Sequence, residues 1–110
     1  MSTGKFEIKK DAKGEFRFNL KAGNGQVILS SEGYSAMDGC TNGIESVKKN
    51  AGDDGRYERK QASNGKHHFN LKAGNGQVIG SSQLYADAGG MENGIASVKA
   101  NAPDAVVEQV

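Results

Sequence analysis

Two adjacent histidines and one cysteine are the residues of this chain best suited to metal binding or catalysis. His67 and His68 stand in an alternating segment, and neighbours on a strand point to opposite faces, so the pair cannot chelate one ion together. We expect His67 at the edge of the core and His68 in solvent. Cys40 lies on an apolar stripe that carries Met91 in a second copy, which favours an inert core thiol over a nucleophile.

Other motifs for chemistry are absent from the sequence. GNGQVI (23–28) superficially resembles a glycine-rich dinucleotide fingerprint, but it lies between two expected strands instead of between a strand and a helix. There is no P-loop, metalloprotease motif or CxxC pair. An enzyme also needs clustered ionisable groups around a base, and none is visible. We therefore expect no catalytic residue, no cofactor and no metal ligand.

A repeated polar set is a better candidate for a site. Its members alternate with apolar residues, so they are expected on the sheet face opposite the core. They are Asn19, Lys21, Asn70 and Lys72. They form either an ordinary solvated sheet face or a shallow binding surface of basic character. Tyr34 and Tyr85 are repeated too, and a structural contact of the hydroxyl group is the simplest explanation for them.

These elements belong to an internal duplication with an offset of 51 residues. Between residues 15–51 and 66–102, 23 of 37 aligned positions are identical. The longest matches are FNLKAGNGQVI (18–28 and 69–79) and NGIESVKKNA against NGIASVKANA (42–51 and 93–102). Two copies are too few for a long solenoid, so we expect one pseudo-two-fold domain, in effect a fused homodimer.

Each copy has the pattern of three strands followed by one helix. Alternating apolar residues predict strands over 5–10, 16–22 and 26–31, and 56–61 opens the second copy in the same way. Residues 104–110 are apolar enough for a closing strand. The helices are predicted by a stripe at helical spacing, Met37, Cys40, Ile44 and Val47, repeated as Ala88, Met91, Ile95 and Val98.

Asn24-Gly25 predicts a hairpin turn in either of two registers. A two-residue turn places Val27 and Leu29 on the core face. A three-residue turn, with Gly25 in the left-handed region, places Ile28 there instead. The second copy keeps the isoleucine and replaces the leucine by glycine, which favours the three-residue turn.

The helix ends and two internal glycines carry further expectations. Asp87 can cap the second helix, and Asn50 and Asn101 are natural left-handed C-caps. Gly43 and Gly94 interrupt the helices beside the apolar stripe, where glycine is unfavourable. Their presence in both copies predicts a close approach of each helix to the sheet.

The pattern predicts an α+β fold with one domain over residues 1–110. Two tandem β-β-β-α repeats, about 3–52 and 54–103, and a closing strand at 104–110 share one antiparallel sheet. The helices pack on this sheet, and a pseudo-two-fold axis relates the repeats.

The motifs LKAGNGQVI, SSEGY and NGIESVKKNA resemble those of the YegP-like bacterial family, a domain of unknown function. The resemblance covers both copies and implies two such repeats sharing one antiparallel sheet, with C-terminal strands exchanged between the halves. It implies that relatives with one repeat reach the same arrangement as homodimers. It brings no reaction, cofactor or catalytic residue. The second copy departs from the pattern at Gly80 and at Gly89-Gly90.

Composition narrows the functions that remain. The 110 residues carry 14 Lys and Arg against 13 Asp and Glu, a net charge of +1, which gives no electrostatic case for nucleic acid or anionic membrane. One cysteine permits no intramolecular disulfide, and no segment reads as a signal peptide or membrane helix, so we expect a cytoplasmic protein. We expect a monomeric, non-enzymatic binding or interaction module. The alternatives are a nucleic-acid-contacting protein and an enzyme with an unrecognised site.

Overall fold

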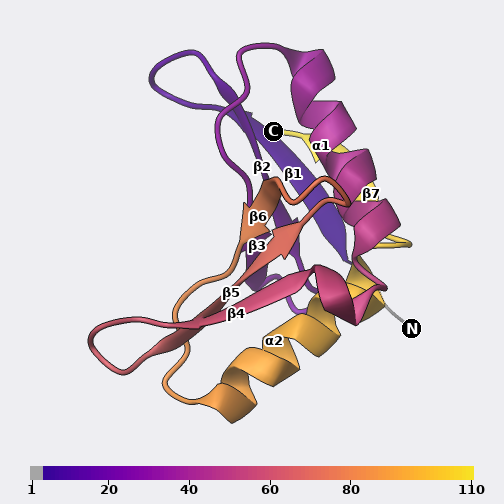
Figure 1. Cartoon of the computed structure of the whole chain (residues 1–110). Helices are drawn as coiled ribbons and strands as arrows, with labels where there is room; N and C mark the ends of the chain where they lie inside the picture. Colours follow the sequence, from indigo (N-terminus) through magenta and orange to yellow (C-terminus); the bar gives the residue numbers. More distant parts are fainter. Residues whose placement is uncertain (1–3) are drawn as a thin grey trace.

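The computed structural model describes residues 4–110, and its elements follow the duplication (Figure 1). The order of elements confirms two β-β-β-α repeats and a closing strand. The first repeat contains β1 (Lys5–Lys10), β2 (Phe16–Lys21), β3 (Val27–Ser30) and α1 (Met37–Asn50). After a short 3-10 turn, η1 (Asp54–Arg56), come β4 (Tyr57–Gln61), β5 (His67–Lys72), β6 (Val78–Ser81), α2 (Ala88–Asn101) and β7 (Val106–Gln109).

All seven strands form one sheet in the order β4-β5-β6-β3-β2-β1-β7. The repeats meet at its centre, where Ser30 of β3 pairs with Ser81 of β6. These serines are equivalent positions of the duplication, so the pseudo-two-fold axis passes between them. Strands β1 to β6 pair antiparallel as predicted, whereas β7 pairs parallel with β1, so the complete sheet is mixed.

The parallel pairing of β7 follows from where α2 ends. A Cβ atom on Gly4, just before β1, would lie 2.7 Å from the Cβ of Asn101, the last residue of α2. The chain leaving α2 therefore reaches the sheet beside the beginning of β1, where the Val106 N–H donates to the Gly4 carbonyl at 3.3 Å. From there it can only run in the direction of β1. The last strand of the second repeat thus completes the first, as the family resemblance implied.

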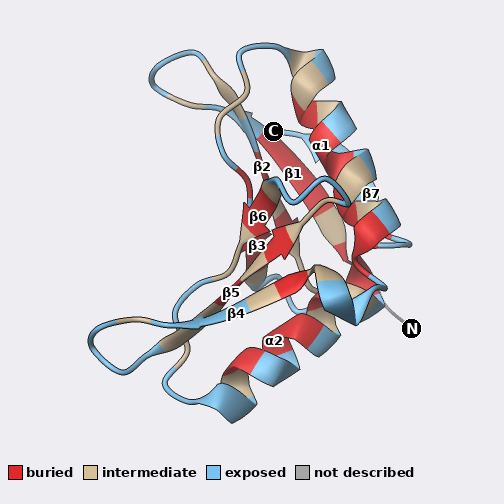
Figure 2. Cartoon of the chain, in the orientation of Figure 1, coloured by how far each residue is buried: buried red, intermediate tan, exposed pale blue. Residues whose placement is uncertain are grey.

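Both helices cover one face of the sheet. Directly paired residues of an antiparallel sheet share a face, so the paired row Asn19, Ser30, Ser81 and Asn70 lies on the opposite, open face. Alternation then turns Phe18, Leu20, Phe69 and Leu71 toward the helices, and all four are buried. Figure 2 shows the buried sides of α1 and α2 turned toward the buried centre of the sheet.

The first hairpin adopts the three-residue turn. Gly25 has a φ of 85°, and the Ala22 N–H donates to the Gln26 carbonyl at 2.9 Å across the loop. The register shifts between Leu20 and Lys21, which makes Ile28 the extra residue of a bulge. Ile28 is buried as the three-residue turn predicts, and the bulge buries Leu29 as well.

The predicted N-terminal cap of α2 is confirmed, whereas the predicted C-terminal caps of both helices are not. Asp87 caps α2 as predicted, since its side chain accepts from the Gly90 N–H at 2.7 Å. The expectation of left-handed caps at Asn50 and Asn101 is wrong, because both are the last residues of their helices and no described residue other than glycine has a positive φ. Both asparagines are buried, and each Nδ2 donates back to a helix carbonyl, that of Ser46 or Ser97, at 2.8 Å.

Over the described residues, no helix combines the length and the apolar character that crossing a bilayer requires.

Candidate functional site

The repeated polar set lies on the open sheet face, as its alternation predicted. Asn19 and Asn70 belong to the paired row that crosses this face, and Lys21 and Lys72 follow them on β2 and β5. Lys21 Nζ lies 2.9 Å from Glu7 Oε1, and Lys72 Nζ lies 3.0 Å from Glu58 Oε2. Each lysine is therefore paired with a carboxylate that the sequence analysis did not include.

These ion pairs reduce the basic character of the open face. The hydrogen bond from Lys21, with a smaller effect of Lys5, lowers the pKa of Glu7 against the opposing effect of its burial. Lys72, then Asn70, lower the pKa of Glu58 in the same way. Both carboxylates are charged at neutral pH and compensate the lysines. Lys21 and Lys72 are thus members of ion-paired polar networks and not free positive charges.

The histidines and the cysteine occupy separate places in the fold. His67 and His68 are partly buried on β5. Cys40 is fully buried in the core, and burial raises the pKa of its thiol, which disfavours the nucleophilic thiolate. Within residues 4–110, no three His, Cys, Asp or Glu side chains converge in the manner of a metal site.

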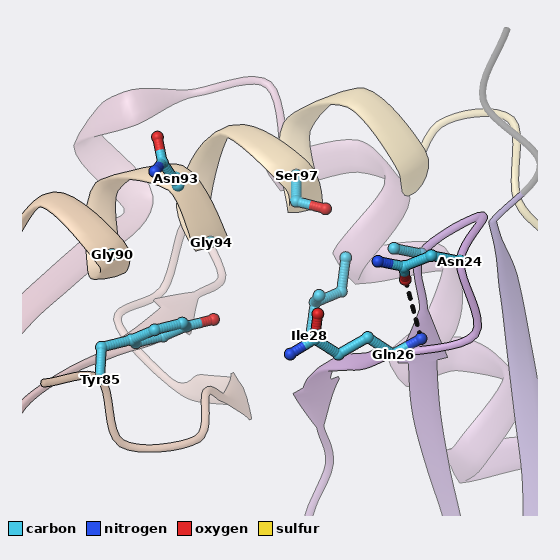
Figure 3. A pocket seen from close by; sticks show the side chains of 9 residues that line it. Asn24, Gln26, Ile28, Tyr85, Gly90, Asn93, Gly94 and Ser97 are labelled. Carbon is cyan, nitrogen blue, oxygen red and sulfur yellow. Dashed lines mark hydrogen bonds between the residues drawn. The ribbon is translucent and has the colours of Figure 1, made fainter.

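A pocket that the sequence analysis did not identify lies between the two repeats (Figure 3). One wall is the first hairpin, whose turn places Asn24 and Gln26 at its tip. Asn24 Oδ1 accepts from the Gln26 N–H at 2.9 Å, which holds this tip in a defined shape. Ala22, directly after β2, and Ile28 of β3 complete the wall on either side of the turn.

The opposite wall belongs entirely to the second repeat. It is one face of α2, with Gly90, Asn93, Gly94 and Ser97 at helical spacing, together with Tyr85. The Tyr85 ring stacks on Phe69 with centroids 6.4 Å apart and an interplanar angle of 10°. A Cβ atom on Gly94 would collide with the Tyr85 hydroxyl oxygen and lie 2.7 Å from its Cζ. The close approach predicted at Gly94 is therefore a contact between α2 and Tyr85. The absence of a side chain on Gly94 leaves room for the tyrosine ring against the helix.

The Tyr85 hydroxyl is directed into the space between α2 and the hairpin (Figure 3). The simplest expectation for the repeated tyrosines is a structural contact of the hydroxyl group. Among the described residues, however, neither Tyr34 nor Tyr85 makes a hydrogen bond through its hydroxyl group. Both hydroxyls keep their full capacity to donate and accept.

A second pocket repeats the first across the pseudo-two-fold axis. It joins the second hairpin to α1 and Tyr34. Every residue that lines the first pocket has its counterpart, 51 positions away, in the lining of the second. The second pocket adds only Glu32 and Val78. The cavities measure about 160 and 240 Å³, smaller than the roughly 300–1,000 Å³ typical of drug-sized ligands.

The two linings are identical in residue type as well as in place. Of the 37 aligned positions of the repeats, 14 differ, yet none of the nine that line both pockets does. The fold explains why several of these nine residues are the same in both copies, for example the glycines. It does not explain Asn42 and Asn93, because both are exposed and, in the described chain, neither side chain forms a hydrogen bond. Nearby exposed helix positions diverge, as Glu45 to Ala96 shows.

The side chains of the first pocket offer neutral hydrogen-bonding groups. Asn24, Gln26 and Asn93 are carboxamides, and Ser97 and Tyr85 contribute hydroxyls, so each can both donate and accept. In the second pocket, burial raises the pKa of Tyr34, with smaller contributions from Cys40 and the carboxylate of Glu32. Tyr34 is thus a neutral phenol at physiological pH.

The pockets are not apparent from the sequence, because each has walls from different repeats. Nothing within one repeat shows that its hairpin tip meets the helix of the other. One available signal was the exact retention of exposed Gln26 and Asn93 in the partner copy, as Gln77 and Asn42.

The fold and the site define a class of protein: a tandem-repeat α+β domain with one small polar pocket at each of two equivalent junctions between its repeats. The model of the family described as Domain of unknown function (DUF1508) matches the chain twice, over residues 11–58 and 62–109. The chain belongs to this family.

Curated relatives extend over nearly the whole chain. The chain is 61% identical over 108 residues to the UPF0339 protein in ptx operon 5'region of Stutzerimonas stutzeri, covering 98% of this chain and 97% of that protein. It is 54% identical over 105 residues to the UPF0339 protein YegP of Escherichia coli K12, covering 96% of each. These names describe uncharacterised proteins and indicate no specific function.

Two solved structures share the fold. The solution NMR structure of YegP from Escherichia coli, described as a protein of unknown function, superposes with a TM-score of 0.94 at 52% identity, covering 99% of this chain and 94% of that one. The solution NMR structure of a UPF0339 protein from Shewanella oneidensis gives 0.92 at 45% identity, covering 97% and 91%.

Proposed function

We propose that this protein is a non-enzymatic binding module that holds small polar molecules in its two inter-repeat pockets. The observation that carries the proposal is the identity of all nine shared lining positions in repeats that differ at 14 of 37. A duplicated chain retains exposed polar side chains in both copies when both copies use them. Asn42 and Asn93 are the clearest case, because their exposed side chains form no hydrogen bond within the described residues.

The chemistry of the lining supports a ligand rich in hydroxyl or carboxamide groups. Such groups both donate and accept, which matches the carboxamide and hydroxyl side chains of the first pocket. Of the side chains that line this pocket, none carries a carboxylate, an ammonium or a guanidinium group. The small cavities suit a single ring or a short polyol.

The experiment is a residue-resolved NMR titration of the whole chain with glucose, glycerol and acetamide. We expect the amide signals of Gly94, Ser97 and Gln26 to shift with those of Gly43, Ser46 and Gln77, which report the second pocket. Replacing Asn42 and Asn93 together by alanine removes one hydrogen-bonding side chain from each pocket. Affinity should fall roughly three- to tenfold, the value of one lost hydrogen bond.

Two control variants keep the pockets intact. Glu45→Ala changes an exposed position of α1 to the residue already present at position 96, and should leave binding unchanged. Lys21→Ser with Lys72→Ser alters the open sheet face, the surface that the sequence analysis singled out. If no probe shifts either pocket at high millimolar concentration, the proposal is wrong. Shifts confined to the open face and abolished by the lysine variant would assign binding to that face instead.

A further inference from the structure

The two pockets differ at one ionisable position. Glu32, in the segment after β3, lines the pocket that contains Tyr34. Its counterpart is Gln83, which is neutral and does not line the first pocket. The two cavities therefore share nine lining positions and differ by one carboxylate.

The charge of Glu32 is available to a ligand. Its side chain is exposed, and within residues 4–110 it forms no ion pair. Arg17 is close enough to feel the negative charge of Glu32, but it is paired with another carboxylate, since its Nε donates to Asp11 Oδ2 at 2.9 Å. Glu32 also contributes to the raised pKa of Tyr34, so its field extends to the hydroxyl group inside the pocket.

We infer that Glu32 makes the second pocket selective for ligands that carry a protonated amine beside their hydroxyl groups, while the first pocket binds the neutral equivalent. An ammonium group near an unpaired carboxylate gains Coulomb energy that a hydroxyl group at the same place does not. This inference rests on the proposed function, because it assigns selectivity to the same two pockets.

The test compares glucosamine with glucose, two probes of one shape that differ by an ammonium in place of a hydroxyl group. Both are titrated at a pH below the pKa of the amine, with the amide signals of Gly43 and Ser46 reporting the second pocket and those of Gly94 and Ser97 the first. We expect the second pocket to prefer glucosamine by about two- to fivefold, the strength of an exposed charge pair. The first pocket should show no preference, and added salt should weaken the preference.

Two variants assign the preference to Glu32. Glu32→Gln installs the residue type that the second repeat already has, and should abolish the preference without loss of glucose binding. Glu108→Gln on β7 removes the same charge at a position that lines neither pocket, and should leave the preference intact.

The outcomes distinguish a failure of the proposed sugar binding from a failure of the role assigned to Glu32. If neither sugar shifts either pocket, the choice of polyhydroxylated ligands fails, and this inference fails with it. If both sugars bind both pockets equally, or if the preference survives Glu32→Gln, binding stands and the role of Glu32 is overturned. A preference lost equally in Glu108→Gln would reflect the overall charge of the protein and would also overturn it.

Discussion

Leu29 occupies the space that a side chain on Gly80 would need. The two residues are equivalent positions of the duplication, on β3 and β6 beside the pseudo-two-fold axis. A Cβ atom on Gly80 would lie 2.7 Å from both Cγ and Cδ2 of Leu29. Near such an axis two leucines would compete for one space, and fusion of the repeats allows one to become glycine. The departure of the second copy at Gly80 is thus a packing requirement.

This relationship predicts compensation between the two positions. Gly80→Leu should destabilise the protein by about 1–3 kcal/mol, because it overpacks a buried site. Leu29→Gly should cost about 2–5 kcal/mol through the cavity it leaves. The double variant, Leu29→Gly with Gly80→Leu, moves the large residue across the axis and should recover much of both losses. Urea unfolding of the four proteins measures the coupling, and strictly additive losses would contradict shared packing.

The contact between α2 and Tyr85 predicts opposite effects for two glycines of one helix. Gly94→Val should destabilise by about 1–3 kcal/mol, because the added atoms meet the tyrosine ring and hydroxyl group. Gly89→Ala is the matched control: its nearest contact would be Asp87 Oδ1 at an ordinary 3.6 Å, so the gain in helix propensity, up to about 1 kcal/mol, should stabilise. A loss of only a few tenths of a kcal/mol for Gly94→Val in a chemical melt would contradict the close approach.

Much of the fold could be predicted because the signals are local. Alternation defines the strands, Asn24-Gly25 the turn, and the stripe from Met37 to Val47 the first helix. The duplication then predicts one pseudo-symmetric sheet. The hairpin register was ambiguous, since Val27, Ile28 and Leu29 are all apolar, and the bulge at Ile28 buries both Ile28 and Leu29.

The remaining features depend on contacts between the repeats. The direction of β7 follows from Gly4 lying against Asn101, residues almost a full chain length apart. Asparagine at a helix end suggests a left-handed cap, but burial of Asn50 and Asn101 leads each side chain to bond its own helix. The pockets arise where a hairpin tip of one repeat meets the helix of the other. The residue patterns within one repeat do not predict this contact between the repeats.

The tandem arrangement predicts a monomer. Both halves of the pseudo-two-fold lie in one chain. The edge strands of the sheet are β4, which carries Glu58, Arg59 and Lys60, and β7, which carries Glu108 beside the exposed Val106 and Val107. Charged side chains on an edge strand oppose pairing between sheets. Light scattering at micromolar concentration should give the mass of one chain, and a stable dimer would count against this arrangement. Removing residues 104–110 should instead expose the β1 edge and promote self-association.

An ionic network beside the β4 edge predicts a pH-dependent contribution to stability. Arg59 stands where the first repeat has buried Ile8, and its Nη2 lies 2.9 Å from Asp54 Oδ1 while its Nε lies 2.5 Å from Glu92 Oε2. Lys99, then Arg59, lower the pKa of Asp54, and Arg59 lowers that of Glu92. The pKa values of these two carboxyl groups in the folded protein lie below their ordinary values of 3.8 and 4.5. The ion pairs therefore stabilise the folded protein at any pH above the ordinary values.

The contribution should disappear in acid, as the pH falls through the lowered pKa values and protonates the two carboxylates. Arg59→Met, which keeps an apolar stem, should therefore be less stable than the wild-type protein at neutral pH, and the two stabilities should converge as the pH falls below the lowered pKa values of Asp54 and Glu92. Salt should shrink the neutral difference, because the groups are solvent-exposed. Lys49→Met, on the outer side of α1 and without an ion pair among residues 4–110, is the control and should give a curve parallel to wild type. Urea unfolding across this pH range measures the curves, and a parallel curve for Arg59→Met would show that the network contributes nothing.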